Sequence, residues 1–276
     1  MPIAFIGGGN MATALIGGML ARGAAVAEFR VVEPFAEARG RLAMRFPGIA
    51  LHADCTREAV AGAALVVLAV KPQQMRQAAE VLAPHLAGVP VPVVLSIAAG
   101  IRLCDLARWL HGHGRLVRAI PNTPALVGKG ISGAFAMSSV DAAGRELVAS
   151  VLAAVGEQVW VDDETMLDAV TAVSGSGPAY VFYFLEALEA AAGELGFAQA
   201  DARKLAYATF AGAVALAQAS PEEPAVLRAQ VTSKGGTTER ALAAMEADAV
   251  KAKIVTAVKA AALRAGELGD AFGRDA

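Results

Sequence analysis

The chain has 276 residues, a length that suits one large domain or two ordinary ones. Its formal net charge is −2, with no dense block of Lys or Arg, which argues against nucleic acid as a partner. Hydrophobic residues make up 56% of the chain, yet it has no run of 18 apolar residues and no signal peptide at its start, so we expect a cytoplasmic protein without a membrane span.

Short runs rich in Val, Ile and Leu alternate with helical periodicity over residues 1–161. This alternation predicts βαβ units and a mostly parallel sheet, and therefore an α/β domain. The expected strands are Ile3–Ile6, Phe29–Glu33, Leu65–Val70, Val91–Ile97, Leu116–Ile120, Gly130–Met137 and Gln158–Val161. The expected helices include Met11–Arg22, Gln73–Leu86 and Ala142–Ala154.

The first strand ends in a glycine-rich turn that leads directly into a helix. The segment Gly7-x-Gly9-x-x-Ala12 occupies this turn, and this context makes the dinucleotide-binding fingerprint informative. Gly7 permits the tight turn, Gly9 lets a pyrophosphate approach the backbone, and Ala12 lets helix and strand pack closely. The free N–H groups at the helix start would then face the phosphates. We therefore expect this domain to bind NAD or NADP.

An acidic residue ends the second strand at the distance typical of this fingerprint. Glu33 closes the run "FRVVE" and would bind the ribose hydroxyls of NAD while repelling the 2′-phosphate of NADP. Arg39 and Arg41, in the helix that follows, either attract that phosphate or lie on a solvated face. The choice between the two coenzymes therefore stays open.

Three later strands end in small or turn-forming residues. Lys71-Pro72 follows one strand, "SIAAG" covers Ser96–Gly100, and "IPNTPA" covers Ile120–Ala125. Open α/β sheets bind ligands at the carboxyl ends of their strands, so these ends would let backbone approach a nicotinamide, and Lys71 would contact phosphate or ribose. A simple strand exit is the alternative explanation for each of them.

The strand-like runs stop near Asp162, and we place a domain boundary between residues 161 and 162. Alanine-rich helical patterns fill residues 162–276 and predict an all-helical second domain. An apolar chain without a membrane span must bury its surface elsewhere, so we expect a homodimer or a larger homo-oligomer. The expected helices are Thr165–Val173, Ala179–Leu195, Ala202–Ala219, Ala225–Val231, Thr238–Ala247 and Ala249–Leu268.

The cysteines and histidines indicate no metal site. Cys55 and Cys104 belong to no C-x-x-C motif, and a structural, reduced pair fits the cytoplasm. All four histidines lie in the first half of the chain, and His111-Gly112-His113 is too short a motif to define a metal site.

A polar, glycine-containing loop precedes one of the predicted helices of the second domain. The stretch "TSKGGTTE" includes Ser233, Gly235, Gly236 and Thr237 and holds more hydroxyls than helix capping requires. The dipole and the free N–H groups of a helix start favour an anion. The sequence therefore predicts a binding site for a small carboxylate at this loop.

The supply of proton donors indicates the class of bond that is reduced. Reduction of a ketone makes an alkoxide and requires an acid such as His or Lys. No histidine follows residue 113, and the predicted helix after Pro178 contains no lysine. A protonated imine needs orientation and a hydrogen bond, which a hydroxyl such as Thr238 supplies. The sequence favours C=N reduction, with Lys234 as the competing candidate for an acid.

An ordered set of motifs resembles the pyrroline-5-carboxylate reductase family. The motifs are "FIGGGNMA", "AVKPQ", "SIAAGI", "RAIPNTPA", "VSGSGPAYVF" and "TSKGGTTERAL". The resemblance runs from Ile3 to about residue 265 and is far more specific than the glycine fingerprint alone. Glu33-Pro34 departs from the Asn-Arg or small polar residue common in the family, so we expect dual coenzyme use or a tilt towards NADH.

The resemblance implies reduction of 1-pyrroline-5-carboxylate, a cyclic imine with a carboxylate, to L-proline by NADPH or NADH. It implies a Rossmann domain followed by an all-helical dimerisation domain. Asn122 would lie near the nicotinamide, and Ser174–Pro178 would form a bend near the active site and the dimer contact. Ser233, Gly235, Gly236 and Thr237 would hold the substrate carboxylate, and Thr238 would bond to the ring nitrogen. The implied dinucleotide contacts are Ile6, Gly7, Gly8, Gly9, Asn10, Met11, Ala69, Val70, Lys71 and Pro72.

Two other functions stay open from the residues alone. A β-hydroxyacid dehydrogenase has a similar two-domain layout but uses a helix lysine as its acid, which is missing after Pro178. A dinucleotide-sensing regulator without turnover would keep Gly7–Ala12 but would have no reason to keep the donors of Ser233–Thr238.

Overall fold

The computed structural model describes residues 1–86 and 91–274. The chain forms two compact units, and we call Met1–Ser176 with Ala261–Ala276 unit 1 and Gly177–Ala260 unit 2. Unit 1 continues past the boundary expected between residues 161 and 162, and it also includes the end of the last helix. The position of the domain boundary therefore stays a prediction.

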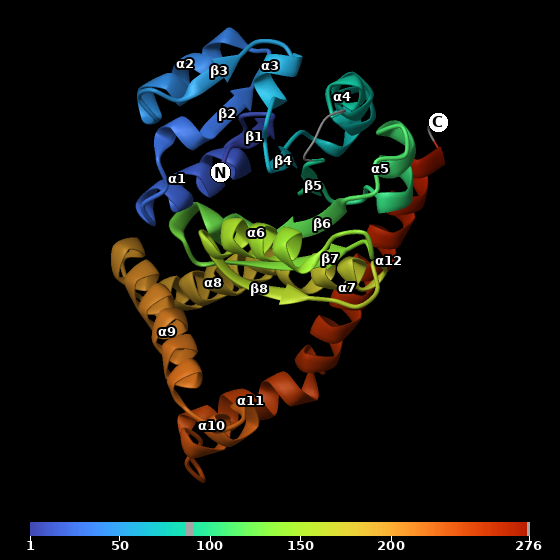
Figure 1. Cartoon of the computed structure of the whole chain (residues 1–276). Helices are drawn as coiled ribbons and strands as arrows, with labels where there is room; N and C mark the ends of the chain where they lie inside the picture. Colours follow the sequence, from blue (N-terminus) through green and yellow to red (C-terminus); the bar gives the residue numbers. More distant parts are fainter. Residues whose placement is uncertain (87–90, 275–276) are drawn as a thin grey trace. The chain divides into compact units, whose positions relative to one another are not determined.

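Unit 1 contains an eight-stranded sheet, coloured from blue to yellow-green in Figure 1. The strand order is β3-β2-β1-β4-β5-β6-β7-β8, and neighbours are parallel except for the antiparallel pair β6–β7. The mostly parallel sheet predicted from the alternation is confirmed. The strands are β1 Ile3–Ile6, β2 Phe29–Val32, β3 Ala50–His52, β4 Leu65–Leu68, β5 Val93–Ser96, β6 Leu116–Pro121, β7 Gly130–Ala136 and β8 Gly156–Trp160.

Helices cover both faces of this sheet because successive side chains of each strand point to opposite sides. In β1, Ile3 and Phe5 pack with α1, α2 and α6, whereas Ala4 and Ile6 pack with α3, α4 and α5. The central strands β1, β4 and β5 are therefore buried on both faces, as parallel strands between two helical layers are. The helices are α1 Asn10–Ala21, α2 Ala36–Arg45, α3 Arg57–Val60, α4 Met75–Leu82, α5 Leu103–Trp109, α6 Ala142–Ala153 and α7 Met166–Val170.

The strand order reverses between β1 and β4, which are hydrogen-bonded neighbours. Chain connections leave these two strands towards opposite sides of the sheet, so a crevice opens at their carboxyl ends. Ile6 pairs with Leu68 at that edge. The sheet therefore places the glycine turn after β1 beside the segment that follows β4.

The helical region after β8 is interrupted at the predicted helix break. α7 passes into a π-helical turn, Thr171–Gly175, and α8 begins at Gly177. π-helical turns inside helices are rare and are frequent at functional sites. The glycine- and proline-containing stretch Ser174–Pro178 thus joins two helices at the point where unit 1 passes into unit 2.

Unit 2 is entirely helical, which confirms the predicted class of the second half. Its described helices have almost no core, because Ala202 and Ala206 are the buried residues among 177–260. Large apolar side chains lie exposed instead, including Phe182, Tyr183 and Leu195. Among the described residues, no helix is both long enough and apolar enough to span a membrane. The helices are α8 Gly177–Glu194, α9 Gln199–Ala219, α10 Pro224–Gln230, α11 Thr237–Ala247 and α12 Val250–Arg274, whose last residues belong to unit 1.

Candidate active site

Gly7 lies in a turn that no other residue could adopt without strain. Its φ is +99°, and a Cβ at this position would lie 2.7 Å from the carbonyl oxygen of Ala69. Its N–H donates to Val32 O at 2.8 Å, and Ala69 N donates to Ile6 O at 2.8 Å. The glycine turn is therefore fixed between β2 and the segment after β4, which requires close backbone approach.

The N-terminus of α1 is open towards solvent. Gly9 is its N-cap residue and supplies no side-chain cap, and no atom lies within 4 Å of the position that a Cβ would take. Within the described residues, the N–H groups of Asn10, Met11 and Ala12 have no acceptor. Such free N–H groups at the positive end of a helix dipole are suited to a phosphate. Ala12 is fully buried against the sheet, as the fingerprint requires.

A cavity of about 440 Å³ lies at the carboxyl ends of the central strands. Gly7 and Gly9 line it from the first turn, and Ala69, Val70 and Lys71 line it from the segment after β4. Lys71 is exposed, and Pro72 begins a 3-10 turn immediately after it. The cavity is further lined by Ile6, Val32, Glu33, Pro34, Phe35, Ala53, Asp54, Cys55, Gln74, Gln77, Ala78 and Val81. Most of the residues expected to bind the dinucleotide thus share one cavity in unit 1.

Glu33 is buried and fully engaged by the backbone around it. Its Oε2 accepts a hydrogen bond from Gly8 N at 3.0 Å, and its Oε1 accepts one from Phe35 N at 3.0 Å. Arg39 donates to the carbonyl oxygens of Glu33 and Pro34 at 2.8 Å and 2.7 Å. The carboxylate therefore holds the glycine turn in addition to lining the cavity, a contact that the sequence did not indicate.

A second hollow, of about 280 Å³, shares Glu33 with the first. Gly8, Gly9 and Asn10 line it from the start of α1, and Arg41 and Arg45 line it from α2. Arg41 also forms an exposed ion pair with Glu37, four residues away on the same helix. Two arginines thus line the same hollow as the carboxylate that was expected to repel a 2′-phosphate.

Asn122 is buried at the carboxyl end of β6, where it joins three segments of unit 1. Its Nδ2 donates to Ser174 O in the π-helical turn at 3.1 Å. Its Oδ1 accepts from Ile131 N in β7 at 3.0 Å. The amide expected near a nicotinamide therefore also holds the π-helical turn against β6.

The polar loop of unit 2 is folded around its two glycines. Gly235 has a φ of +73°, and its N–H donates to Glu239 Oε2 at 2.7 Å. A Cβ on Gly236 would lie 2.5 Å from Ser233 Oγ, so the absence of a side chain lets this hydroxyl lie directly over the backbone. Ser233, Gly235 and Gly236 therefore meet at one point, immediately before α11.

The N-terminus of α11 is also uncapped. Gly236 is its N-cap residue, and the first backbone bond of the helix runs from Arg240 N to Gly236 O. Within the described residues, the N–H groups of Thr237, Thr238 and Glu239 have no acceptor. Ser233 and Thr237 are exposed and Thr238 is half-buried, while Lys234 is exposed. The loop thus presents hydroxyls and free N–H groups of the kind that bind a carboxylate.

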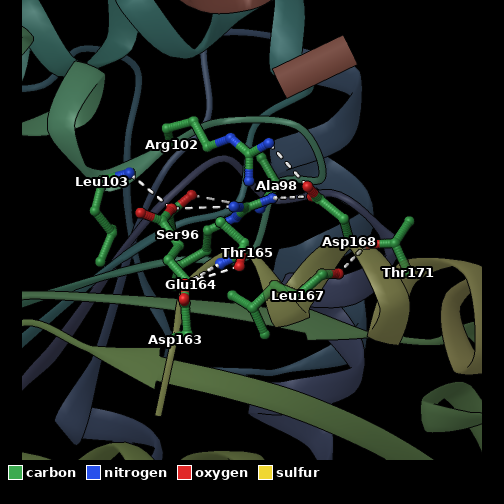
Figure 2. Close-up of polar contacts among 11 residues, drawn as sticks. Ser96, Ala98, Arg102, Leu103, Asp163, Glu164, Thr165, Leu167, Asp168 and Thr171 are labelled. Carbon is green, nitrogen blue, oxygen red and sulfur yellow. Dashed lines mark hydrogen bonds and ion pairs between the residues drawn. The ribbon is translucent and has the colours of Figure 1, made fainter. Parts of the chain in front are cut away.

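Unit 1 also contains a buried ionic cluster that no sequence motif predicted. Arg118, in the middle of β6, is fully buried and donates from Nη1 to Glu164 Oε1 at 3.0 Å. Arg102 Nη2 donates to Asp168 Oδ2 at 2.8 Å, and Asp168 Oδ1 lies 3.8 Å from Arg118 Nη2. Figure 2 shows the bond from Arg102 to Asp168 and, beside it, the bond from Leu103 to Glu164. An arginine inside the apolar run "LVRAI" was the available signal, because a buried charge needs a partner.

Two family models match the two halves of the chain. Residues 2–100 match the model described as NADP oxidoreductase, coenzyme F420-dependent. Residues 164–268 match the model for pyrroline-5-carboxylate reductase dimerisation. The first match contains the turn after β1, the segment after β4 and Glu33, and the second contains the loop before α11.

Curated relatives and solved structures agree with these matches. The pyrroline-5-carboxylate reductase of Haemophilus influenzae is 40% identical, and the match covers 98% of each chain. A solved structure of that reductase from Coxiella burnetii superposes with a TM-score of 0.90 at 37% identity, covering 96% of this chain and 97% of the other. The structure of the Plasmodium falciparum enzyme with NADP bound shares the fold, with a TM-score of 0.85 at 24% identity over 98% of each chain. With 44% identity to the Pseudomonas aeruginosa pyrroline-5-carboxylate reductase over 99% of this chain and 98% of that relative, the chain belongs to the pyrroline-5-carboxylate reductase family of NAD(P)-dependent oxidoreductases.

Proposed function

We propose that this chain reduces the C=N bond of 1-pyrroline-5-carboxylate to give L-proline, with NADPH or NADH as the reductant. Family membership supports the reaction, and the uncapped N-terminus of α11 behind Ser233–Gly236 is the observation that carries it. A carboxylate is the part of this substrate that such a helix start would recognise. The turn after β1 and the α1 N-terminus suit a pyrophosphate for the same physical reason.

In the coenzyme cavity, the residues of this chain would bind the coenzyme and orient it. The free N–H groups of Asn10, Met11 and Ala12 would hold the pyrophosphate, and Gly9 leaves room for its approach. Lys71 would contact phosphate or ribose from the segment after β4. When bound, a reduced nicotinamide supplies the hydride.

In the loop before α11, the residues of this chain would hold the carboxylate and fix one face of the ring. Ser233 and Thr237 would complete an anion site with the free N–H groups at the start of α11, in the loop whose close backbone approach Gly235 and Gly236 permit. Thr238 would form a hydrogen bond with the ring nitrogen. The protonated imine carries its own positive charge and becomes a neutral amine on hydride addition, so orientation is required of the protein rather than a strong acid.

The proposal is tested by following oxidation of NADPH and of NADH by the purified protein in the presence of 1-pyrroline-5-carboxylate. We expect substrate-dependent oxidation with formation of proline in equal amount. A 3-keto acid serves as the control substrate, because a β-hydroxyacid dehydrogenase would reduce it. Turnover of the keto acid without turnover of the imine would contradict the proposal, and binding of coenzyme without any turnover would favour a sensor.

A further inference from the structure

The ionic cluster around Arg118 lies in unit 1, none of its four charged residues lines either of the two hollows beside Glu33, and the proposed chemistry does not use it. It contains two arginines and two carboxylates, so its formal charges cancel. Glu164 Oε1 accepts from both Arg118 Nη1 and the backbone N–H of Leu103 at 3.0 Å and 2.9 Å. The cluster therefore joins β6, the start of α5 and the region of α7.

The cluster is not arranged for maximal stability. Within the described residues, Arg118 Nε and Nη2, Arg102 Nη1 and Asp168 Oδ1 are buried without a hydrogen-bond partner. Burial is also the main cause that lowers the pKa of Arg118, and Glu164 opposes it. Replacing such buried ion pairs by apolar residues is often neutral or stabilising. We therefore expect the cluster to fix the position of the elements that it joins, and to add little to the free energy of unfolding.

The position that it fixes is that of α7 and the π-helical turn. Glu164 and Asp168 are four residues apart and bond to Arg118 and Arg102 at one end of this segment. At the other end, Ser174 O accepts from Asn122, which immediately follows β6. β6 thus holds the same helical segment twice. Between these two points, a Cβ on Gly133 of β7 would lie 2.5 Å from Val170, so the segment lies directly on the sheet.

The end of α12 packs on the same cluster. A Cβ on Gly269 would lie 2.7 Å from Arg102 Nε, and a Cβ on Gly266 would lie 3.7 Å from Asp168 Oδ2. The α12 backbone therefore contacts the Arg102 guanidinium at Gly269, which has no side chain. The chain leaves unit 1 after Ser176 and returns at Ala261, so both crossings are continuous with elements that this cluster holds.

We propose that Arg118 is a positioning residue for the reductase reaction, acting through Glu164 and Asp168 to fix α7, the π-helical turn and the Asn122 amide bonded to it. The inference rests on the proposed function, because the amide at the end of β6 is expected beside the nicotinamide. A misplacement of about 1 Å near the reacting atoms lowers the rate by about a hundredfold. Arg118 touches neither coenzyme nor substrate in this proposal.

The test compares Arg118→Met with Arg118→Lys and with the control Arg115→Met. Arg115 lies immediately before β6 and pairs with Asp141 near the surface, so its loss removes an arginine from the same strand region. We expect Arg118→Met to lower kcat about ten- to hundredfold, because the reacting groups would be oriented less well. KM for NADPH should change less than about twofold, because coenzyme binding would not be affected. Arg118→Lys should restore part of kcat, and Arg115→Met should behave like the wild type.

The deuterium isotope effect on kcat, measured with NADPH labelled at the transferred position, separates positioning from folding. A poorly positioned hydride donor makes the chemical step slower, so the isotope effect should rise in Arg118→Met. A variant that only folds in smaller yield loses kcat with an unchanged isotope effect, and that result would overturn the inference. Asp168→Asn keeps the Arg118–Glu164 bond and serves as the second variant if Arg118→Met fails to fold.

Amide hydrogen exchange gives a readout that does not depend on turnover. Exchange should increase in residues 166–176 of Arg118→Met and remain unchanged in α6, which packs on the opposite face of the sheet. Unchanged exchange in residues 166–176 would overturn the inference even if activity fell. A wild-type protein that fails to reduce the imine would instead contradict the proposed function, so the two failures are distinguishable.

Discussion

The carboxylate of Glu33 accepts a hydrogen bond from the backbone N–H of Gly8 at 3.0 Å, which ties the end of β2 to the glycine turn after β1. Its other oxygen accepts from Phe35 N at 3.0 Å. A residue expected to contact the ribose therefore also shapes the turn that would hold the pyrophosphate. Glu33 would therefore have two roles, a contact to the ribose and a contact that shapes the glycine turn. Substitution of Glu33 tests the two roles separately.

We expect Glu33→Ser to raise KM for both coenzymes about tenfold or more, because a hydrogen bond to a charged group is worth about 1.5–3 kcal/mol. Removal of the negative charge should at the same time raise the ratio of kcat/KM for NADPH to that for NADH. Steady-state kinetics with both coenzymes measure these effects. Glu58→Ser, at an exposed acid of the same unit, is the control for net charge. A preference for NADPH in the wild type that the change leaves untouched would place Glu33 away from the ribose.

Thr238→Ala should lower kcat/KM for the imine about ten- to hundredfold, because one hydrogen bond to a charged partner of about 1.5–3 kcal/mol is lost. KM for the coenzyme should barely change, since the coenzyme cavity lies in unit 1. Thr256→Ala removes a hydroxyl that bonds to Ala252 O in α12 and is the matched control. If Lys234→Ala abolishes turnover with substrate still bound, while Thr238→Ala has no effect, Lys234 is the acid and the argument from the missing acid is wrong.

The protein should be a homodimer or a larger homo-oligomer in solution. Unit 2 exposes large apolar side chains such as Phe182 at 58% and Tyr183 at 72%, and its described helices bury only Ala202 and Ala206. Obligate interfaces bury more than about 2,000 Å² in total, which would supply the missing core. Light scattering at micromolar concentration measures the mass, and an active monomer there would contradict the prediction.

Cys55 should be protected from thiol reagents by NADPH, whereas Cys104 should not. Cys55 lines the cavity of about 440 Å³, and Cys104 is exposed on α5. Burial raises the pKa of the Cys55 thiol, so its thiolate fraction at pH 8 is reduced and its labelling should be slow, becoming faster as the pH rises. Mass spectrometry of the labelled peptides distinguishes the two sites. Equal labelling of Cys55 with and without saturating coenzyme would show that the coenzyme binds elsewhere.

Elements that depend on local signals in the chain could be predicted from the amino-acid sequence. Alternating apolar runs and helical periodicity predicted both halves of the fold, and the turn at Gly7–Ala12 followed from glycines placed between a strand and a helix. These signals are local, because backbone conformation and side-chain alternation depend on near neighbours in the chain. β3, which has three residues and is only partly buried, lacked such a signal and was missed.

Contacts between groups that are distant in the chain could not be predicted from local signals. Glu33 could be assigned to the end of β2, but its bonds to Gly8 N and Phe35 N depend on how the turn after β1 lies beside that end. Arg118 bonds to Glu164, which is 46 residues later in the chain. No local sequence pattern indicates this pair. Such pairs form because burial forces each charge to find a counter-charge from another element, and the packing of β6 against α5 and α7 determines which one is within reach.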